Sequence, residues 1–133
     1  MSSVTKASES PEHKRLVKSL MDYLRNEGFG ITCASYTGFS QCDETKGHIP
    51  DVRGTNDEKL NAIGEAKTCD DLNNERTKEQ FKVFSNRMMK KGKSEGKSVP
   101  FYIAITEGCE EELEETLKNL NLDRKANIYR VSF

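Results

Sequence analysis

The chain has 133 residues, of which 34% are hydrophobic and 32% charged, and this size and composition suit one domain with a small core. Its longest mainly apolar stretch, 99–105, is far shorter than the roughly 20 residues of a membrane-spanning helix, so we expect no membrane protein. The formal net charge of -1 does not by itself indicate nucleic-acid binding, and the N-terminus has no apolar signal segment, which favours a cytoplasmic protein.

Residues 1–9 are rich in serine and are expected to form a flexible tail, with 10–133 as a single domain. Ser10 and Pro11 are typical of a helix N-cap and first turn. Apolar residues then recur every three or four positions, which predicts a helix that ends near residues 27–28. A strand over 31–36 and a polar loop over 37–47 follow.

Two further strands are expected over 49–53 and 60–67, joined by turn residues at 54–58. Helical periodicity continues over 74–91, and a loop rich in Gly, Lys and Ser over 92–98 leads to an apolar, interior strand over 99–106. A third helix over 109–120 and a strand over 127–132 complete the chain. The order of elements predicts an α/β fold, with a mixed β-sheet flanked by α-helices.

The four cysteines lie at wide, irregular spacings without a C-x-x-C pair: Cys33, Cys42, Cys69 and Cys109. In a cytosolic protein, cysteines at such spacings are expected to be reduced thiols. Because the only two histidines, His13 and His48, are also far apart in the sequence, a structural zinc site is disfavoured.

Charge is unevenly distributed along the second half of the chain. The segment 76–97 has eight basic and two acidic residues, whereas 107–123 has seven acidic residues and one basic residue. A surface polarised in this way can attract a polyanion to one side. On charge alone, two solvated helix faces explain the pattern equally well.

Chemistry-bearing residues gather on the predicted hairpin. Glu65 and Lys67 are two residues apart on one strand, and Asp51 and Arg53 are two apart on the other, so each pair shares a face. If the register sets Asp51 beside Glu65, two carboxylates and a lysine converge. Carboxylate oxygens suit Mg²⁺, and a lysine nearby can hold a phosphate. Gly64 would let another backbone or a ligand approach closely.

An ordinary ion-pair cluster is the alternative interpretation of the same residues. In it, Lys67 and Arg53 neutralise the two acids at the surface, where such pairs contribute little to stability.

Pro50-Asp51, thirteen residues and then Glu65-Ala66-Lys67 resemble the PD-(D/E)xK nuclease signature, on a hairpin that follows an N-terminal helix. That superfamily includes restriction endonucleases and archaeal Holliday-junction resolvases, and the resemblance covers 11–106. It implies a restriction endonuclease-like fold. It also implies a nuclease that depends on Mg²⁺ (or Mn²⁺) and hydrolyses phosphodiester bonds in DNA, with specificity for DNA structure as one form of that activity.

The resemblance also implies roles for individual residues. Asp51 and Glu65 correspond to the metal ligands, the Ala66 carbonyl to a backbone ligand, and Lys67 to the catalytic lysine. Resolvase-like members carry a glutamate on the first helix, for which Glu12 is the best candidate because it continues the row of core leucines at i, i+4 spacing. The alternative for Glu12 is an acid that stabilises the first turn of the helix.

Several branches of the superfamily carry a glutamine on the helix after the E-x-K strand. Gln80 matches that position, and its row with Phe84 and Met88 directs it toward the sheet. The RecB-like branch has a tyrosine four residues later, where this chain has Phe84. A half-buried glutamine at the edge of the core is the alternative.

DNA is the expected partner, and a homodimer or a partner subunit would be needed for base-specific recognition. The candidates for phosphate contacts are Lys82, Arg87, Lys90, Lys91, Lys93 and Lys97. Two other functions stay open. One is a non-catalytic nucleic-acid-binding module or subunit on the same fold, and the other is an interaction domain that uses the acidic segment 110–115.

Overall fold

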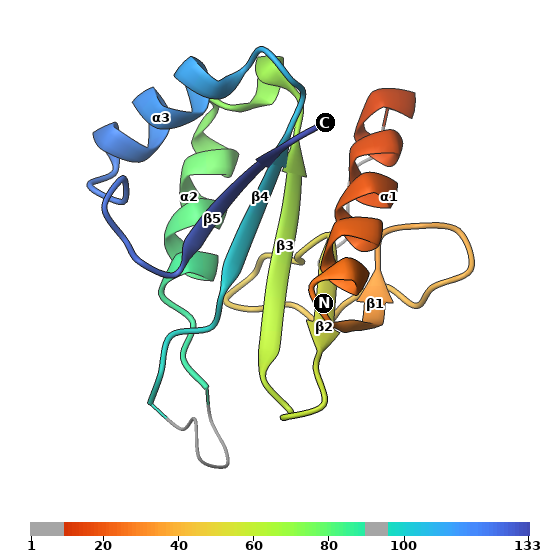
Figure 1. The fold of residues 1–133 in the computed structure, drawn as a ribbon. Coiled ribbons are helices and arrows are strands. Elements are labelled where there is room, and N and C mark those ends of the chain that lie inside the picture. Colours follow the sequence, from red (N-terminus) through yellow and green to blue (C-terminus); the bar gives the residue numbers. More distant parts are fainter. Residues whose placement is uncertain (1–9, 90–95) are drawn as a thin grey trace.

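The computed structural model describes residues 10–89 and 96–133, and its strands form one mixed sheet in the order β1-β2-β3-β4-β5 (Figure 1). The strands are β1 (Gly30–Ala34), β2 (Val52–Thr55), β3 (Asn61–Lys67), β4 (Phe101–Ile105) and β5 (Ile128–Ser132). The helices are α1 (Pro11–Asn26), α2 (Glu75–Ser85) and α3 (Glu110–Asn119), with a short 3₁₀ helix at Cys69–Asp71. The predicted α/β class is confirmed.

The mode of strand pairing changes once across the sheet. β1, β2 and β3 pair antiparallel, whereas β3, β4 and β5 pair parallel. Each parallel connection crosses over through a helix, and successive right-handed crossovers in one direction place their helices on the same face. Accordingly α2 and α3 cover one face of the sheet and α1 covers the other (Figure 1).

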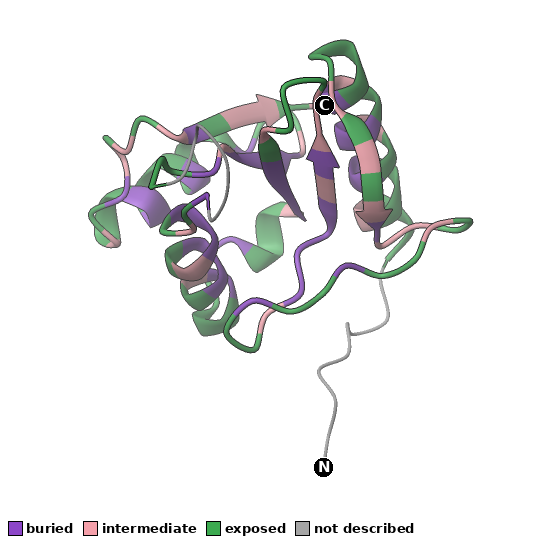
Figure 2. Cartoon of the chain, turned by 90° about the horizontal axis from the view of Figure 1, so that it is seen from below, coloured by how far each residue is buried: buried purple, intermediate pink, exposed green. Residues whose placement is uncertain are grey.

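The alternation of side chains along β4 divides the core into two layers. Phe101, Ile103 and Ile105 pack with α2 and α3, whereas Tyr102 and Ala104 pack with α1. All five residues are buried, as expected for an interior strand (Figure 2). β3 follows the same alternation: Ile63 belongs to the α2 and α3 layer, and Ala62 and Ala66 belong to the α1 layer.

α1 begins as the sequence predicts, because Ser10 accepts a hydrogen bond from the His13 N–H at 3.1 Å and Pro11 occupies the first turn. Among the described residues, no helix has the length and apolar character to cross a bilayer. The predicted tail, residues 1–9, lies outside the described residues.

The helix predicted over 74–91 is shorter in the structure. α2 ends at Ser85, whose carbonyl accepts hydrogen bonds from the side chains of Lys125 and Asn127, each at 2.9 Å. Beyond Asn86 the chain pairs with the segment before β4: Val99 N–H donates to the Arg87 carbonyl at 2.9 Å. Tertiary pairing therefore overrides the helical periodicity.

The cysteines correct the expectation of reduced thiols. Cys33 is bonded to Cys42 and Cys69 to Cys109. The first disulfide ties the loop after β1 back to β1, and the second joins the 3₁₀ helix to the residue before α3. Spacing along the sequence did not reveal these pairs because the partners meet only through the fold.

Candidate active site

The register of the β2-β3 hairpin sets Asp51 beside Glu65. Val52 is opposite Gly64, and the Asp51 N–H donates to the Gly64 carbonyl at 3.1 Å and to Glu65 Oε1 at 3.0 Å. In return, Asp51 Oδ2 accepts a hydrogen bond from the Ala66 N–H at 2.8 Å. Each acid is therefore held by a main-chain N–H of the opposite arm. Both side chains are fully buried, and we call them the carboxylate pair.

Two basic groups face the carboxylate pair. Lys67 Nζ lies 3.4 Å from Glu65 Oε2, and its side chain is 11% exposed. His13 Nε2 lies 3.2 Å from Asp51 Oδ2, and its side chain is 14% exposed. The structure thus brings together Asp51, Glu65 and Lys67, as the hairpin pattern predicted, and adds a histidine from α1.

His13 was missed at the sequence level, although a signal for it exists. It precedes Leu16 and Val17 by three and four residues, the spacing that places it on the buried stripe of α1. Helix α1 therefore extends its core-facing side to the carboxylate pair.

Two neighbouring buried acids are a candidate site for a cation. If both acids are ionised, two carboxylates without solvent exposure carry a large desolvation cost, and the like charges of neighbouring carboxylates repel each other. Lys67 supplies one compensating charge at 3.4 Å. A divalent cation bound between the acids would offset both effects.

The donor set fits Mg²⁺ as this ion is usually bound, through one or two carboxylates together with substrate phosphate and water. Within the described residues, no three His, Cys, Asp or Glu side chains group as a metal-binding cluster, and a main-chain oxygen is one candidate for a further protein ligand. The N–H and C=O of one strand residue project to the same side. Because the Ala66 N–H reaches Asp51, the Ala66 carbonyl is directed toward the same edge.

The two other candidate site residues have different surroundings. Glu12 is exposed, and its Oε1 accepts a hydrogen bond from the Thr106 hydroxyl at 3.0 Å, beyond the end of β4. The row of core leucines therefore does not carry Glu12 into the interior. Gln80 is 1% exposed on α2, so it points toward the sheet as predicted, and its Oε1 has no hydrogen-bond partner among the described residues.

Arg53 is not part of this charge cluster. Its guanidinium donates instead to the Asp43 carbonyl at 3.2 Å and to Thr45 Oγ1 at 2.7 Å. The ion-pair interpretation that paired Arg53 with the two acids is wrong in that respect. Gly64 also differs from the expectation, because the group that lies against it is the Leu20 side chain of α1 rather than a backbone or a ligand.

The candidate phosphate contacts are described in part. Lys82 is exposed on the last turn of α2, Lys97 is exposed before β4, and Arg87 is half-buried. Lys90, Lys91 and Lys93 lie outside the described residues.

No protein-family model matches the sequence, and no curated protein matches it either. Among solved structures, the chain is similar to the crystal structure of a repair endonuclease from Pyrococcus abyssi, with a TM-score of 0.47 and 16% sequence identity. The match covers 97% of this chain and 49% of that chain, so this chain spans about half the length of that protein. At this level of similarity, functional inference rests on the geometry of the site.

Proposed function

We propose that this chain is a nuclease that depends on Mg²⁺ (or Mn²⁺) and hydrolyses phosphodiester bonds in DNA, with Asp51, Glu65 and Lys67 at its centre. The observation that carries the proposal is the buried carboxylate pair, in which each acid accepts a hydrogen bond from a main-chain N–H of the opposite arm. Lys67 Nζ lies 3.4 Å from Glu65 Oε2. These residues occupy the positions of the signature that the sequence resembles.

In this proposal Asp51, Glu65 and the Ala66 carbonyl would hold the metal, which when bound would supply Lewis-acid activation of water and of the phosphate. Lys67 is a point charge that orients the attacking water or stabilises charge on the phosphoryl oxygens. His13 fixes the orientation of Asp51 through the contact at 3.2 Å. Lys82, Arg87 and Lys97 attract the DNA backbone without reading its sequence.

The test is a cleavage assay on labelled DNA junctions, flaps, duplexes and single strands, with Mg²⁺, with Mn²⁺ and with chelator. We expect metal-dependent cleavage by the wild type, and a loss of about 100-fold or more in Asp51→Asn, Glu65→Gln and Lys67→Ala. Asp57→Asn is the matched control, because Asp57 is an exposed acid in the turn of the same hairpin. Cleavage that survives all three substitutions would remove this site from consideration.

A non-catalytic DNA-binding module is the second candidate. The observation in its favour is that both acids already accept main-chain hydrogen bonds that fasten the two arms of the hairpin. The same assay separates the candidates, because a module would bind DNA and cleave none of the substrates with either metal.

A further inference from the structure

A second polar cluster is formed by Arg53 of β2, Thr45 in the loop before β2 and Arg87 after α2. The guanidinium groups of Arg53 and Arg87 both donate to Thr45 Oγ1, Arg53 Nη2 at 2.7 Å and Arg87 Nη1 at 2.5 Å. We call these two residues the arginine pair. Thr45 is buried, and both arginines are half-buried.

Three separate parts of the chain fix this arrangement. Arg53 is in β2, opposite Ile63 on one side and Cys33 on the other. Arg87 is held by the hydrogen bond from Val99 N–H to its carbonyl. Thr45 begins a two-residue turn in which Lys46 and Gly47 both have positive φ, 49° and 84°, and Thr45 pairs with His48 across that turn.

The Cys33–Cys42 disulfide strengthens this placement. Cys33 is the neighbour of Arg53 across the β1-β2 ladder, and Cys42 lies three residues before Thr45. The loop that carries Thr45 is therefore tied covalently to the strand beside Arg53. Such a preorganised site loses little conformational freedom when it binds a ligand.

The electrostatics favour an anion at this cluster. Burial lowers the pKa of Arg53, the nearby charge of Arg87 lowers this pKa further, and Asp43 partly offsets the effect. Among the described residues, neither arginine forms an ion pair with a carboxylate, and the buried Arg53 Nε has no hydrogen-bond acceptor. An anion that accepted hydrogen bonds from both guanidiniums would relieve their mutual repulsion.

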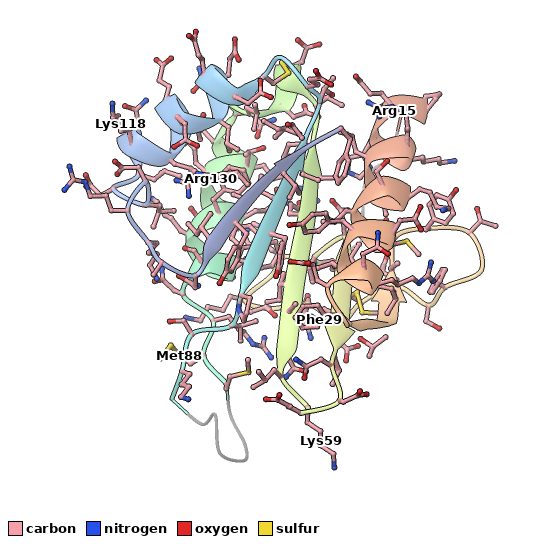
Figure 3. All side chains as sticks on the ribbon, in the orientation of Figure 1. Arg15, Phe29, Lys59, Met88, Lys118 and Arg130 are labelled. Carbon is pink, nitrogen blue, oxygen red and sulfur yellow. A yellow bond between two sulfur atoms is a disulfide. The ribbon has the colours of Figure 1, made fainter. Side chains whose placement is uncertain are left out.

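Two cavities give access to the cluster. One of about 330 Å³ is lined by both arginines together with Thr32 and Asn61. The other, of about 580 Å³, is lined by Arg87 and Thr45 together with Lys46, Lys82 and one acid, Glu44. Met88, labelled in Figure 3, lines both cavities and is 45% exposed. The surroundings are therefore open to solvent and mainly basic.

We propose that the arginine pair binds a backbone phosphate of the DNA strand, separate from the phosphate at the carboxylate pair. This inference rests on the proposed function and names a contact of the same substrate. Arg53 follows Asp51 by two residues, about 7 Å along an extended strand. A guanidinium fork suits a phosphate because its planar N–H groups match two phosphate oxygens. The second phosphate would set the position of the strand on the enzyme.

The test measures binding of a fluorescently labelled DNA duplex to the full chain in chelator, where no cleavage occurs. We expect Arg53→Gln and Arg87→Gln each to weaken binding about tenfold and to reduce the slope of log K against log salt by about one. Arg124→Gln, at an exposed arginine before β5, is the matched control and should leave the slope unchanged. Arg87→Lys keeps the charge, so it should retain the slope while losing affinity.

Neutral methylphosphonate linkages, introduced one at a time, locate the contact. The linkage that replaces the phosphate bound by the arginine pair should weaken DNA binding to the wild type. The same linkage should cause no further loss of affinity in Arg87→Gln. The inference is overturned if both arginine variants keep the wild-type DNA affinity and salt slope, or if they lose no more affinity than Arg124→Gln does. Because no metal is present, this result is distinct from failure of the nuclease proposal, in which the duplex would bind but not be cleaved when metal is added.

Discussion

Two acids without solvent exposure define the site at the level of single residues. Asp51 and Glu65 each accept a main-chain N–H, at 2.8 and 3.0 Å, and these hydrogen bonds hold the carboxylates in fixed orientations. A preorganised site usually lowers the stability of the folded protein, because its charged groups are held in fixed orientations and are poorly solvated. The same features make the site sensitive to His13, an α1 side chain that contacts Asp51.

We predict that His13→Ala lowers the rate of metal-dependent cleavage by about 10- to 100-fold and raises the Mg²⁺ concentration needed for half-maximal rate, because a contact that orients a metal ligand is lost. His13→Gln should recover part of the rate, since its amide can still donate to Asp51. The measurement is a single-turnover rate across a Mg²⁺ titration. His48→Ala, the other histidine in the chain, is the control. A wild-type rate and Mg²⁺ midpoint in His13→Ala would exclude this role.

Tyr102 provides a prediction about pH. Burial raises its pKa from 10.0 to about 12, and Tyr129, Glu27 and Tyr23 act in the same direction. The Tyr129 ring stacks on it at 4.8 Å. Because the unfolded chain releases this proton first, the free energy of unfolding should fall as the pH rises from about 10 to about 12. Urea denaturation across this range measures the fall, and Tyr102→Phe should lessen it. An equal pH dependence in both proteins would contradict the assignment.

At the level of elements, the contact between α1 and β3 depends on Gly64. A Cβ at this position would lie 2.7 Å from Leu20 Cδ2 and 3.3 Å from Leu20 Cγ, and Leu20 is fully buried. We predict that Gly64→Ala lowers the free energy of unfolding by about 1–3 kcal/mol through overpacking. Urea denaturation measures the loss.

Gly30→Ala is the control for that experiment. At Gly30 the nearest atom to an added Cβ is the Thr55 carbonyl oxygen at 3.6 Å, an ordinary contact. If Gly64→Ala and Gly30→Ala are equally stable, α1 does not pack closely over Gly64.

The hairpin was accessible to sequence analysis because both of its signals are local. Turn residues and a two-residue side-chain period fix which residues share a face, and Asp51 meets Glu65 as a consequence. The end of α2 was not accessible in this way. Ser85 ends the helix because Lys125 and Asn127, some 40 positions later in the chain, bond to its carbonyl.

The cluster of Arg53 with Arg87 illustrates the same limit. Strand period places Arg53 on the face of Asp51, but it says nothing of a loop that brings Thr45 alongside. Arg87, the second arginine that donates to Thr45, is 42 residues away in the sequence. Its contact with Thr45 depends on the pairing of the segment after α2 with the segment before β4. Contacts between distant segments have no periodic signature, which is also why the cysteine pairs were missed.

Across the whole molecule, disulfides and ion pairs join elements that no strand ladder connects. The Cys69–Cys109 bond links the 3₁₀ helix after β3 to the residue before α3. Arg130 of β5 holds α3 through Glu114, with Nε at 2.7 Å from one carboxylate oxygen and Nη2 at 3.2 Å from the other; Arg130 is labelled in Figure 3. The position of α3 therefore depends on long-range links.

We predict that the chain, purified without reductant, has no thiol that reacts with a thiol reagent after denaturation. Removing the Cys69–Cys109 bond, which closes a separation of 40 residues, should lower the free energy of unfolding by about 4 kcal/mol. Removing Cys33–Cys42, with a separation of 9, should cost about 2.5 kcal/mol. Double Cys→Ser variants of each pair, compared by urea denaturation, measure the two losses. Four reactive thiols in the native preparation would contradict this disulfide pattern.

The carboxylate pair has opposite consequences for stability as a metal site and as a structural ion-pair cluster. If it is a metal site, Asp51→Asn removes one of two repelling buried charges and still offers an oxygen to the Ala66 N–H. Stability in chelator should then be unchanged or higher, by about 1 kcal/mol. If the cluster is structural, the substitution leaves a basic partner uncompensated and destabilises the protein.

Thermal melts of the wild type and Asp51→Asn, each in chelator and in excess Mg²⁺, separate these cases. A metal site predicts that Mg²⁺ stabilises the wild type, by about 2.7 kcal/mol at 100 times its Kd, and the variant much less. It also predicts that the variant melts no lower than the wild type in chelator. A variant that melts well below the wild type in chelator, with no shift by Mg²⁺ in either protein, would contradict a metal site at Asp51 and Glu65.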